Sequence, residues 1–191
     1  MNRRTYLKST LILGALGLTS LSIFKWIDLT KPVNPALLWS KKDIIAELAE
    51  MIIPETDTPG AKSASVPDYI INVLLNCMDI KKQNKFCAGI KALEAYSVNN
   101  YGKKFLDCSA TERLEVFDYF ARHAGFSYRI LNRINNKFFG EPFYLTLRDL
   151  TIEGYCMSQK GATLGLAYDY IPVNYNACIP LQPNQKSWAT K

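Results

Sequence analysis

The sequence predicts an all-α protein built as a single helical domain. Apolar residues recur at spacings of three and four in several segments, which is the periodicity of one helix face. Few segments alternate apolar and polar residues with a period of two, so a sheet has little to form from. Of the 191 residues, 48% are hydrophobic and 21% are charged, and this composition suits one globular domain once any leader is set aside.

The N-terminus has the form of an export signal. Arg3, Arg4 and Lys8 precede an uncharged run over residues 9–24 that is rich in Leu, Ile, Gly and Ala, as in a cationic region followed by a short apolar one. The paired arginines, with an aromatic residue and then Leu7 and Lys8 after them, resemble a twin-arginine signal, which is read by the twin-arginine translocase. This pattern predicts a periplasmic protein that is exported already folded.

Residues 1–30 are therefore a predicted signal or N-terminal anchor. No clear Ala-x-Ala cleavage site follows the apolar run, and the stretch from Leu11 to Ile27 is close to the lower length limit for a bilayer span. Cleavage and retention as an inner-membrane anchor both stay open. The alternative of a buried amphipathic helix is disfavoured because a surface helix needs a polar face.

The helical domain is predicted over residues 41–191. Irregular segments lie on both sides of its first helix. Residues 31–40 contain two prolines and predict a linker, since proline interrupts helix and favours extended backbone. Ser40 is expected to cap the helix that follows, and Pro54 is expected to end it. Residues 54–61, PETDTPGA, are dense in turn formers and predict a long ordered loop.

Five more helices and a tail complete the predicted fold. Pro67 suits the first turn of a helix, and Ser109 with Glu112 forms a predicted capping box. The last residues, 167–191, contain several prolines and predict an extended, irregular C-terminal tail. The five helices are expected at residues 66–77, 80–97, 109–125, 127–139 and 141–159.

The five cysteines have two interpretations that depend on the compartment. In an oxidising periplasm one or two disulfides are expected, and the odd count leaves one thiol over. The favoured pairs are Cys77 with Cys87 and Cys156 with Cys178, and a remaining exposed cysteine is a candidate for bridging to a partner. In the cytoplasm all five, including Cys108, would be ordinary small buried residues.

The charge pattern does not suggest nucleic-acid binding. The net charge is +6 and the pI is near 9.0, but the basic residues are scattered among acidic ones. No segment resembles a basic arm or a recognition helix. We therefore expect no nucleic-acid partner.

The sequence offers no convincing catalytic, cofactor-binding or metal-binding set. His123 is the only histidine, and a lone histidine beside an apolar helix face is more often structural than catalytic. No Cys-x-x-Cys pair occurs, which leaves structural zinc and covalent haem without support. Glu55 and Asp57 lie in a turn, where carboxylates more often fix a loop than transfer protons. We therefore interpret the chain as a subunit rather than as a complete enzyme.

Three segments carry a resemblance to a known family. They read MIIPETDTPGA at residues 51–61 with VPDYI at 66–70, LTIEGY at 150–155 with LAYDYIP at 166–172, and NACIPL at 176–181. In this order, behind a twin-arginine-like leader, they are similar to the gluconate 2-dehydrogenase subunit 3 family. Cys156 departs from the family pattern, which expects a bulkier or polar residue there and leaves the disulfide scheme open.

The resemblance implies a non-catalytic small subunit with no cofactor of its own. Its expected partner is a large flavoprotein dehydrogenase of the glucose–methanol–choline type, which holds FAD and the sugar or sugar-acid site. The small subunit would support folding, flavin loading and export of that partner, and some such complexes add a multihaem cytochrome c. The alternatives are a self-standing periplasmic oxidoreductase that uses Glu55, Asp57 or His123, and a cytoplasmic maturation chaperone.

The residues expected to contact the partner come from the long loop and from the last helix. The loop offers an irregular surface whose shape is fixed by prolines. The last helix offers apolar and aromatic side chains, which suit the centre of an interface. For Ile152 and Tyr155, packing of the last helix is an equal alternative. The predicted contact residues are Pro54, Glu55, Thr56, Asp57, Pro59, Thr151, Ile152, Glu153 and Tyr155.

Overall fold

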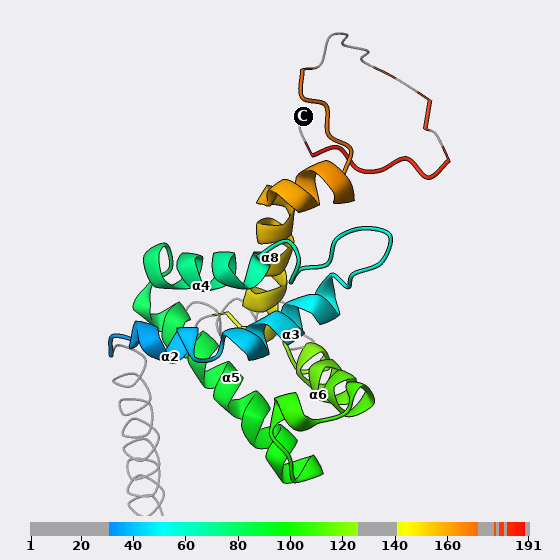
Figure 1. Ribbon diagram of the computed structural model, residues 1–191. Coiled ribbons are helices and arrows are strands. Elements are labelled where there is room, and N and C mark those ends of the chain that lie inside the picture. Colours follow the sequence, from blue (N-terminus) through cyan, green and yellow to red (C-terminus); the bar gives the residue numbers. More distant parts are fainter. Residues whose placement is uncertain (1–30, 126–140, 172–177, 179, 182, 190–191) are drawn as a thin grey trace, which may run out of the picture.

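The computed structural model describes residues 31–125 and 141–171, together with 178, 180–181 and 183–189. The predicted leader at residues 1–30 and the predicted helix at 127–139 lie outside the described residues. The elements in chain order are α2 (Pro35–Trp39), α3 (Lys42–Ile52), α4 (Val66–Asn76), α5 (Ile80–Tyr101), the 3-10 turn η1 (Phe105–Asp107), α6 (Ala110–Arg122), α8 (Phe143–Met157) and the π-helical turn η2 (Gly161–Gly165). The predicted all-α fold is confirmed (Figure 1).

Helix α8 is the central element of the core. It packs against α3, α4, α5 and α6 and crosses behind α3 and α4 in Figure 1. Leu147 and Leu150 of α8 are buried together with Ile70 of α4 and Ile90 of α5. Burying each such aliphatic side chain is worth about 1.5–3 kcal/mol, so α8 holds the domain together.

The predicted linker at residues 31–40 contains a short helix instead. Asn34 accepts a hydrogen bond from the Ala36 N–H at 3.0 Å, and Pro35 occupies the first position of α2. Proline is tolerated there because that N–H has no partner within a helix. Ser40 ends α2 by donating its N–H to Ala36 O at 2.9 Å, so its predicted role as the cap of the next helix is wrong.

Helix α5 is one turn longer than the sequence suggested. Asn100 does not break the helix, because its side chain donates to Tyr96 O at 2.8 Å and so leaves the helical backbone undisturbed. The helix ends at Gly102, whose φ of 66° is the left-handed conformation that glycine adopts readily.

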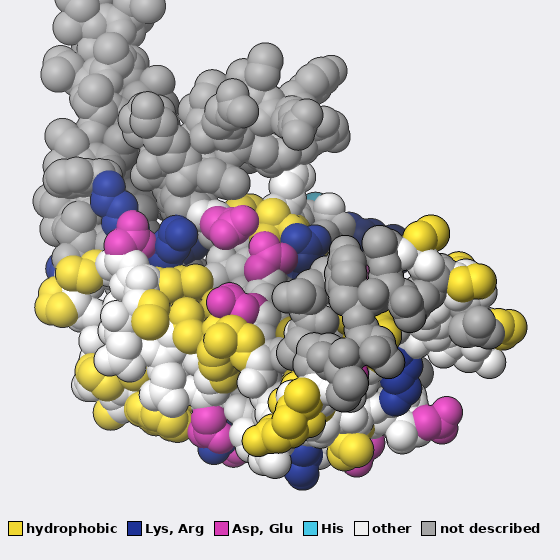
Figure 2. All heavy atoms as spheres, turned by 90° about the horizontal axis from the view of Figure 1, so that it is seen from above, with side chains coloured by type: hydrophobic (Ala, Val, Ile, Leu, Met, Phe, Trp, Pro, Cys, Tyr) yellow, Lys and Arg dark blue, Asp and Glu magenta, His cyan; other side chains and the backbone are white. Residues whose placement is uncertain are grey.

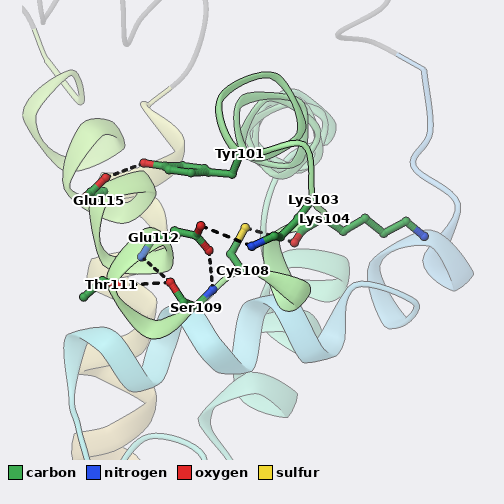
Figure 3. Close-up of polar contacts among 8 residues, drawn as sticks. All are labelled: Tyr101, Lys103, Lys104, Cys108, Ser109, Thr111, Glu112 and Glu115. Carbon is green, nitrogen blue, oxygen red and sulfur yellow. Dashed lines mark hydrogen bonds and ion pairs between the residues drawn. The ribbon is translucent and has the colours of Figure 1, made fainter.

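The capping box at the start of α6 is confirmed (Figure 3). The Ser109 hydroxyl accepts from the Glu112 N–H at 3.3 Å, and the Glu112 carboxylate accepts from the Ser109 N–H at 2.7 Å. These hydrogen bonds to Ser109 hold the pKa of Glu112 below its usual value. Nearby, Tyr101 donates to Glu115 at 2.7 Å, and this bond raises the pKa of Tyr101 to about 12.

Three helix ends differ from the predicted ones by a few residues. Helix α6 ends at Arg122 rather than at Gly125, and α8 runs from Phe143 to Met157 rather than over residues 141–159. Among the described helices, none combines the length and apolar character needed to span a membrane.

Candidate functional site

The loop after α3 is held by one carboxylate. Glu50 accepts hydrogen bonds from the Glu55 N–H at 2.8 Å and from the Lys62 N–H at 2.9 Å. A Cβ on Gly60 would lie 2.2 Å from a carboxylate oxygen of Glu50 and 2.7 Å from the backbone nitrogen of Glu55, so a side chain here would displace either the carboxylate or the loop backbone. We call residues 53–62 the Glu50 loop, and its shape is fixed by the chain itself.

A second carboxylate ties the Glu50 loop to the helices. Glu47 lies 2.5 Å from the Lys62 ammonium and 3.0 Å from the Arg113 guanidinium of α6. Neither Glu47 nor Glu50 is among the site residues predicted from the sequence. Their contacts with the loop could not be predicted from local pattern, because they form only when the loop folds back onto α3. The one sequence feature that could have indicated them is a carboxylate one helical turn before a segment rich in Pro and Gly.

The predicted contact residues of the Glu50 loop lie at the surface. Four of them are exposed, and Pro59 is half-buried. The one large aliphatic residue of the loop, Ile53, is half-buried against the core, and no large hydrophobic side chain of residues 53–62 is exposed. The exposed four are Pro54, Glu55, Thr56 and Asp57.

The predicted contact residues of α8 divide into two groups. Ile152 and Glu153 are exposed, whereas Thr151 and Tyr155 are buried. The Thr151 hydroxyl donates to Leu147 O at 2.7 Å, and Tyr155 belongs to the hydrophobic core. Thr151 and Tyr155 therefore pack α8 against the rest of the domain, the alternative already open for Tyr155.

The chain turns sharply after α8. Ser158 donates its hydroxyl to Tyr155 O at 2.8 Å and accepts from the Gly161 N–H at 2.9 Å. A Cβ on Gly161 would lie 2.0 Å from Tyr155 O, a separation that no side chain tolerates without movement of the backbone. This turn sets the direction in which the next described residues, 161–171, leave α8.

Beyond the turn the chain forms what we call the C-terminal arm, residues 161–171 with 183–189. Ala167 donates its N–H to Ser187 O and accepts from the Ala189 N–H, each at 2.8 Å, and Lys186 donates to Leu164 O at 2.6 Å. The arm thus closes on itself, and Figure 1 shows its described parts projecting from the end of α8, away from α5 and α6. The described residues of the predicted tail form no helix, and they make one isolated bridge between Ala167 and Trp188.

Exposed apolar side chains gather at this end of the chain. Tyr170 is 82% exposed, Ile171 66% and Leu181 85%. Together with the end of α8, the exposed large hydrophobic residues here are Ile152, Met157, Leu164, Tyr168, Tyr170, Ile171, Leu181 and Trp188. On the face drawn in Figure 2, hydrophobic side chains reach the surface in several places and basic ones lie among acidic ones.

The cysteines form neither of the predicted disulfides. All five are free thiols. Cys77 is exposed at the end of α4, while Cys87 is buried in α5, where burial raises its pKa. Cys156 and Cys178 are both exposed.

His123 lies at the end of α6 beside a cavity of about 420 Å³. Its Nδ1 is 2.7 Å from Tyr119 O, and its ring centroid is 4.2 Å from that of Tyr119. These contacts give the histidine a structural role within α6. Over the described residues, no group of three or more His, Cys, Asp or Glu side chains is placed to hold a metal ion.

Together these features describe a small helical domain with a self-fixed loop and an apolar arm that the domain itself leaves uncovered. Residues 40–173 match the family described as Gluconate 2-dehydrogenase subunit 3, and the chain belongs to this family. The family is an accessory subunit of a multi-subunit gluconate dehydrogenase, so partner subunits are implied. Comparison with curated proteins and with solved structures gave no match.

Proposed function

We propose that the chain is the non-catalytic small subunit of a membrane-associated, FAD-dependent dehydrogenase that oxidises a CH–OH group of gluconate or glucose. The catalytic partner is a flavoprotein of the glucose–methanol–choline type, and FAD and substrate belong to that partner. A multihaem cytochrome c is the expected electron acceptor in complexes with a third subunit. The role of this chain is to support the folding of the flavoprotein and to carry it through the membrane.

The observation that carries the proposal is the position of the family match. It begins at residue 40, shortly after a segment that resembles a twin-arginine signal with Arg3, Arg4, Leu7 and Lys8. Such signals are addresses read by a receptor, and this route transports folded proteins. A partner that lacks a leader and binds this chain in the cytoplasm would therefore be exported with it, and an uncleaved leader would hold the complex at the inner membrane.

The test is to replace the paired arginines conservatively and to follow the partner. We expect Arg3→Lys with Arg4→Lys to leave the flavoprotein in the cytoplasm, because the receptor reads the arginine pair rather than its charge. Dye reduction with gluconate and with glucose is measured in periplasmic and cytoplasmic fractions. Lys25→Arg, within the same leader but outside the twin-arginine motif, serves as the control and should leave the distribution unchanged.

Two outcomes would contradict the proposal. If the flavoprotein still reaches the periplasm in full with both arginines replaced, the chain is not its carrier, and a chain found only in the cytoplasm would indicate a maturation chaperone. If the purified chain alone shows a flavin spectrum and reduces dye with these substrates, it is a self-standing oxidoreductase.

A further inference from the structure

The C-terminal arm leaves several large apolar side chains exposed. The arm contains two charged side chains, Asp169 and Lys186, among its 18 residues, whereas 21% of the whole chain is charged. Interface centres are depleted of charged residues and enriched in Tyr, Trp and Met. The composition of the arm thus matches the centre of a protein interface rather than an ordinary solvated surface.

The exposed area is also of the right size. Each Tyr or Trp side chain buries roughly 150–250 Å² when fully covered; Tyr170 is 82% exposed, whereas Tyr168 and Trp188 are 43% and 46% exposed, so only part of that area is still open. With Leu164, Ile171 and Leu181 added, the open area approaches the ~800 Å² that each partner contributes to a standard interface. A typical monomer leaves a largest apolar patch of only about 300–600 Å².

The arm is shaped before a partner arrives. The turn at Gly161 sets the direction in which the arm leaves α8. The hydrogen bonds of Ala167 with Ser187 and Ala189 hold its two segments, residues 161–171 and 183–189, together. A hollow of about 310 Å³ beside Trp188, lined by Leu181 and Ser187 among others, is open to an inserted side chain. Pre-organisation of this kind reduces the ordering cost of binding.

We propose that this arm, with Ile152 and Met157 at the end of α8, is the surface that binds the flavoprotein subunit, and that the exposed side chains of the Glu50 loop contribute little to that contact. The inference rests on the proposed function, because it takes the flavoprotein as the occupant. The choice of a partner subunit over a second copy of this chain follows from membership in a family of accessory subunits. The matching surface on the flavoprotein would be apolar, with pockets for Tyr170 and Ile171.

The experiment measures binding of the full-length chain to the purified FAD-containing large subunit, with the flavin absorbance as the signal. Two arm variants, Tyr170→Ser and Leu164→Ser, are each expected to weaken binding at least tenfold. The matched control is Leu114→Ser on α6, because Leu114 is 57% exposed and Leu164 is 55% exposed. The control should bind within about twofold of the unmodified chain, and all three variants should keep its melting temperature.

The possible results separate the inference from the proposed function. If the unmodified chain binds the flavoprotein and the arm variants bind as well as Leu114→Ser, the arm is not the contact surface and the proposed function stands. If the unmodified chain binds no flavoprotein, the proposed function itself fails. If the chain instead self-associates and the arm variants abolish this, the occupant is a second copy.

Discussion

The Glu50 loop and the C-terminal arm differ in how their polar and apolar groups are satisfied. Both are irregular, and both carry segments that resemble the family pattern. In the loop, the Glu50 carboxylate accepts two backbone N–H groups, and the exposed residues are polar or proline. In the arm, Ala167 bonds to Ser187 and Ala189 of the same arm and the turn bonds back to Ser158, while Tyr170 and Ile171 remain exposed to solvent. The loop is held by bonds within the chain and exposes no large apolar side chain, whereas the arm leaves large apolar side chains exposed to water.

An irregular segment with prolines is therefore not in itself a contact surface. Exposed polar side chains contribute little to binding, because water satisfies them equally well in the free protein. Large apolar side chains that the fold leaves uncovered gain free energy only when another surface removes them from water. The same fold therefore stabilises one irregular segment internally and presents the other.

The largest expected effect comes from changing the turn that directs the arm. Gly161→Ala would place a Cβ 2.0 Å from Tyr155 O, so the backbone has to shift. We expect a loss of about 1–3 kcal/mol in the free energy of unfolding and at least tenfold weaker flavoprotein binding. Ala162→Ser adds an atom at the next position and should change neither quantity appreciably. Unchanged binding by Gly161→Ala would show that the direction of the arm is unimportant.

A smaller effect is expected from the loop. Glu50→Ala removes a charged acceptor of two N–H groups, and bonds of this kind are worth about 1.5–3 kcal/mol each when shielded. Because the two N–H groups are partly exposed, we expect a total loss of about 2 kcal/mol, measured by denaturant unfolding. Glu50→Gln keeps an acceptor oxygen and should lose less. Flavoprotein binding should stay within about twofold; a loss as large as that of Tyr170→Ser would break the contrast between loop and arm.

The sequence predicted the local features of the fold well and the long-range ones poorly. The capping box at Ser109 and the start of α4 at Val66 depend on neighbours in the chain, so local pattern was enough. The closure of the loop on Glu50 and the burial of Tyr155 depend on where distant segments return, which no local pattern specifies. The helix at Pro35 was missed because proline was treated as a breaker rather than as a first helical residue.

A further test concerns the acid side of the pH dependence. The hydrogen bonds from Ser109 hold the pKa of Glu112 below its usual value. The stability from this carboxylate is therefore present above the unfolded-state pKa and is lost as the pH falls through the lowered folded-state pKa. We expect Glu112→Gln to reduce the dependence of the unfolding midpoint on pH in the acid range. An unchanged acid profile would contradict the charged capping box.

The smallest effect is expected at alkaline pH. Because the bond to Glu115 raises the pKa of Tyr101 to about 12, the stability from this bond is present below pH 10 and is lost as the pH rises toward 12. Absorbance titration near 295 nm should show a tyrosine that ionises late, and Glu115→Gln should lower the pH at which it ionises. Identical titration curves would show that this bond does not form.

The contrast between the arm and the Glu50 loop can be measured by hydrogen exchange of the full-length chain, alone and bound to its FAD-containing large subunit. We expect binding to slow exchange in residues 161–171 and 183–189 and to leave residues 53–62 unchanged, since Glu50 already holds the loop. Slower exchange in residues 53–62, with none in the arm, would contradict this contrast.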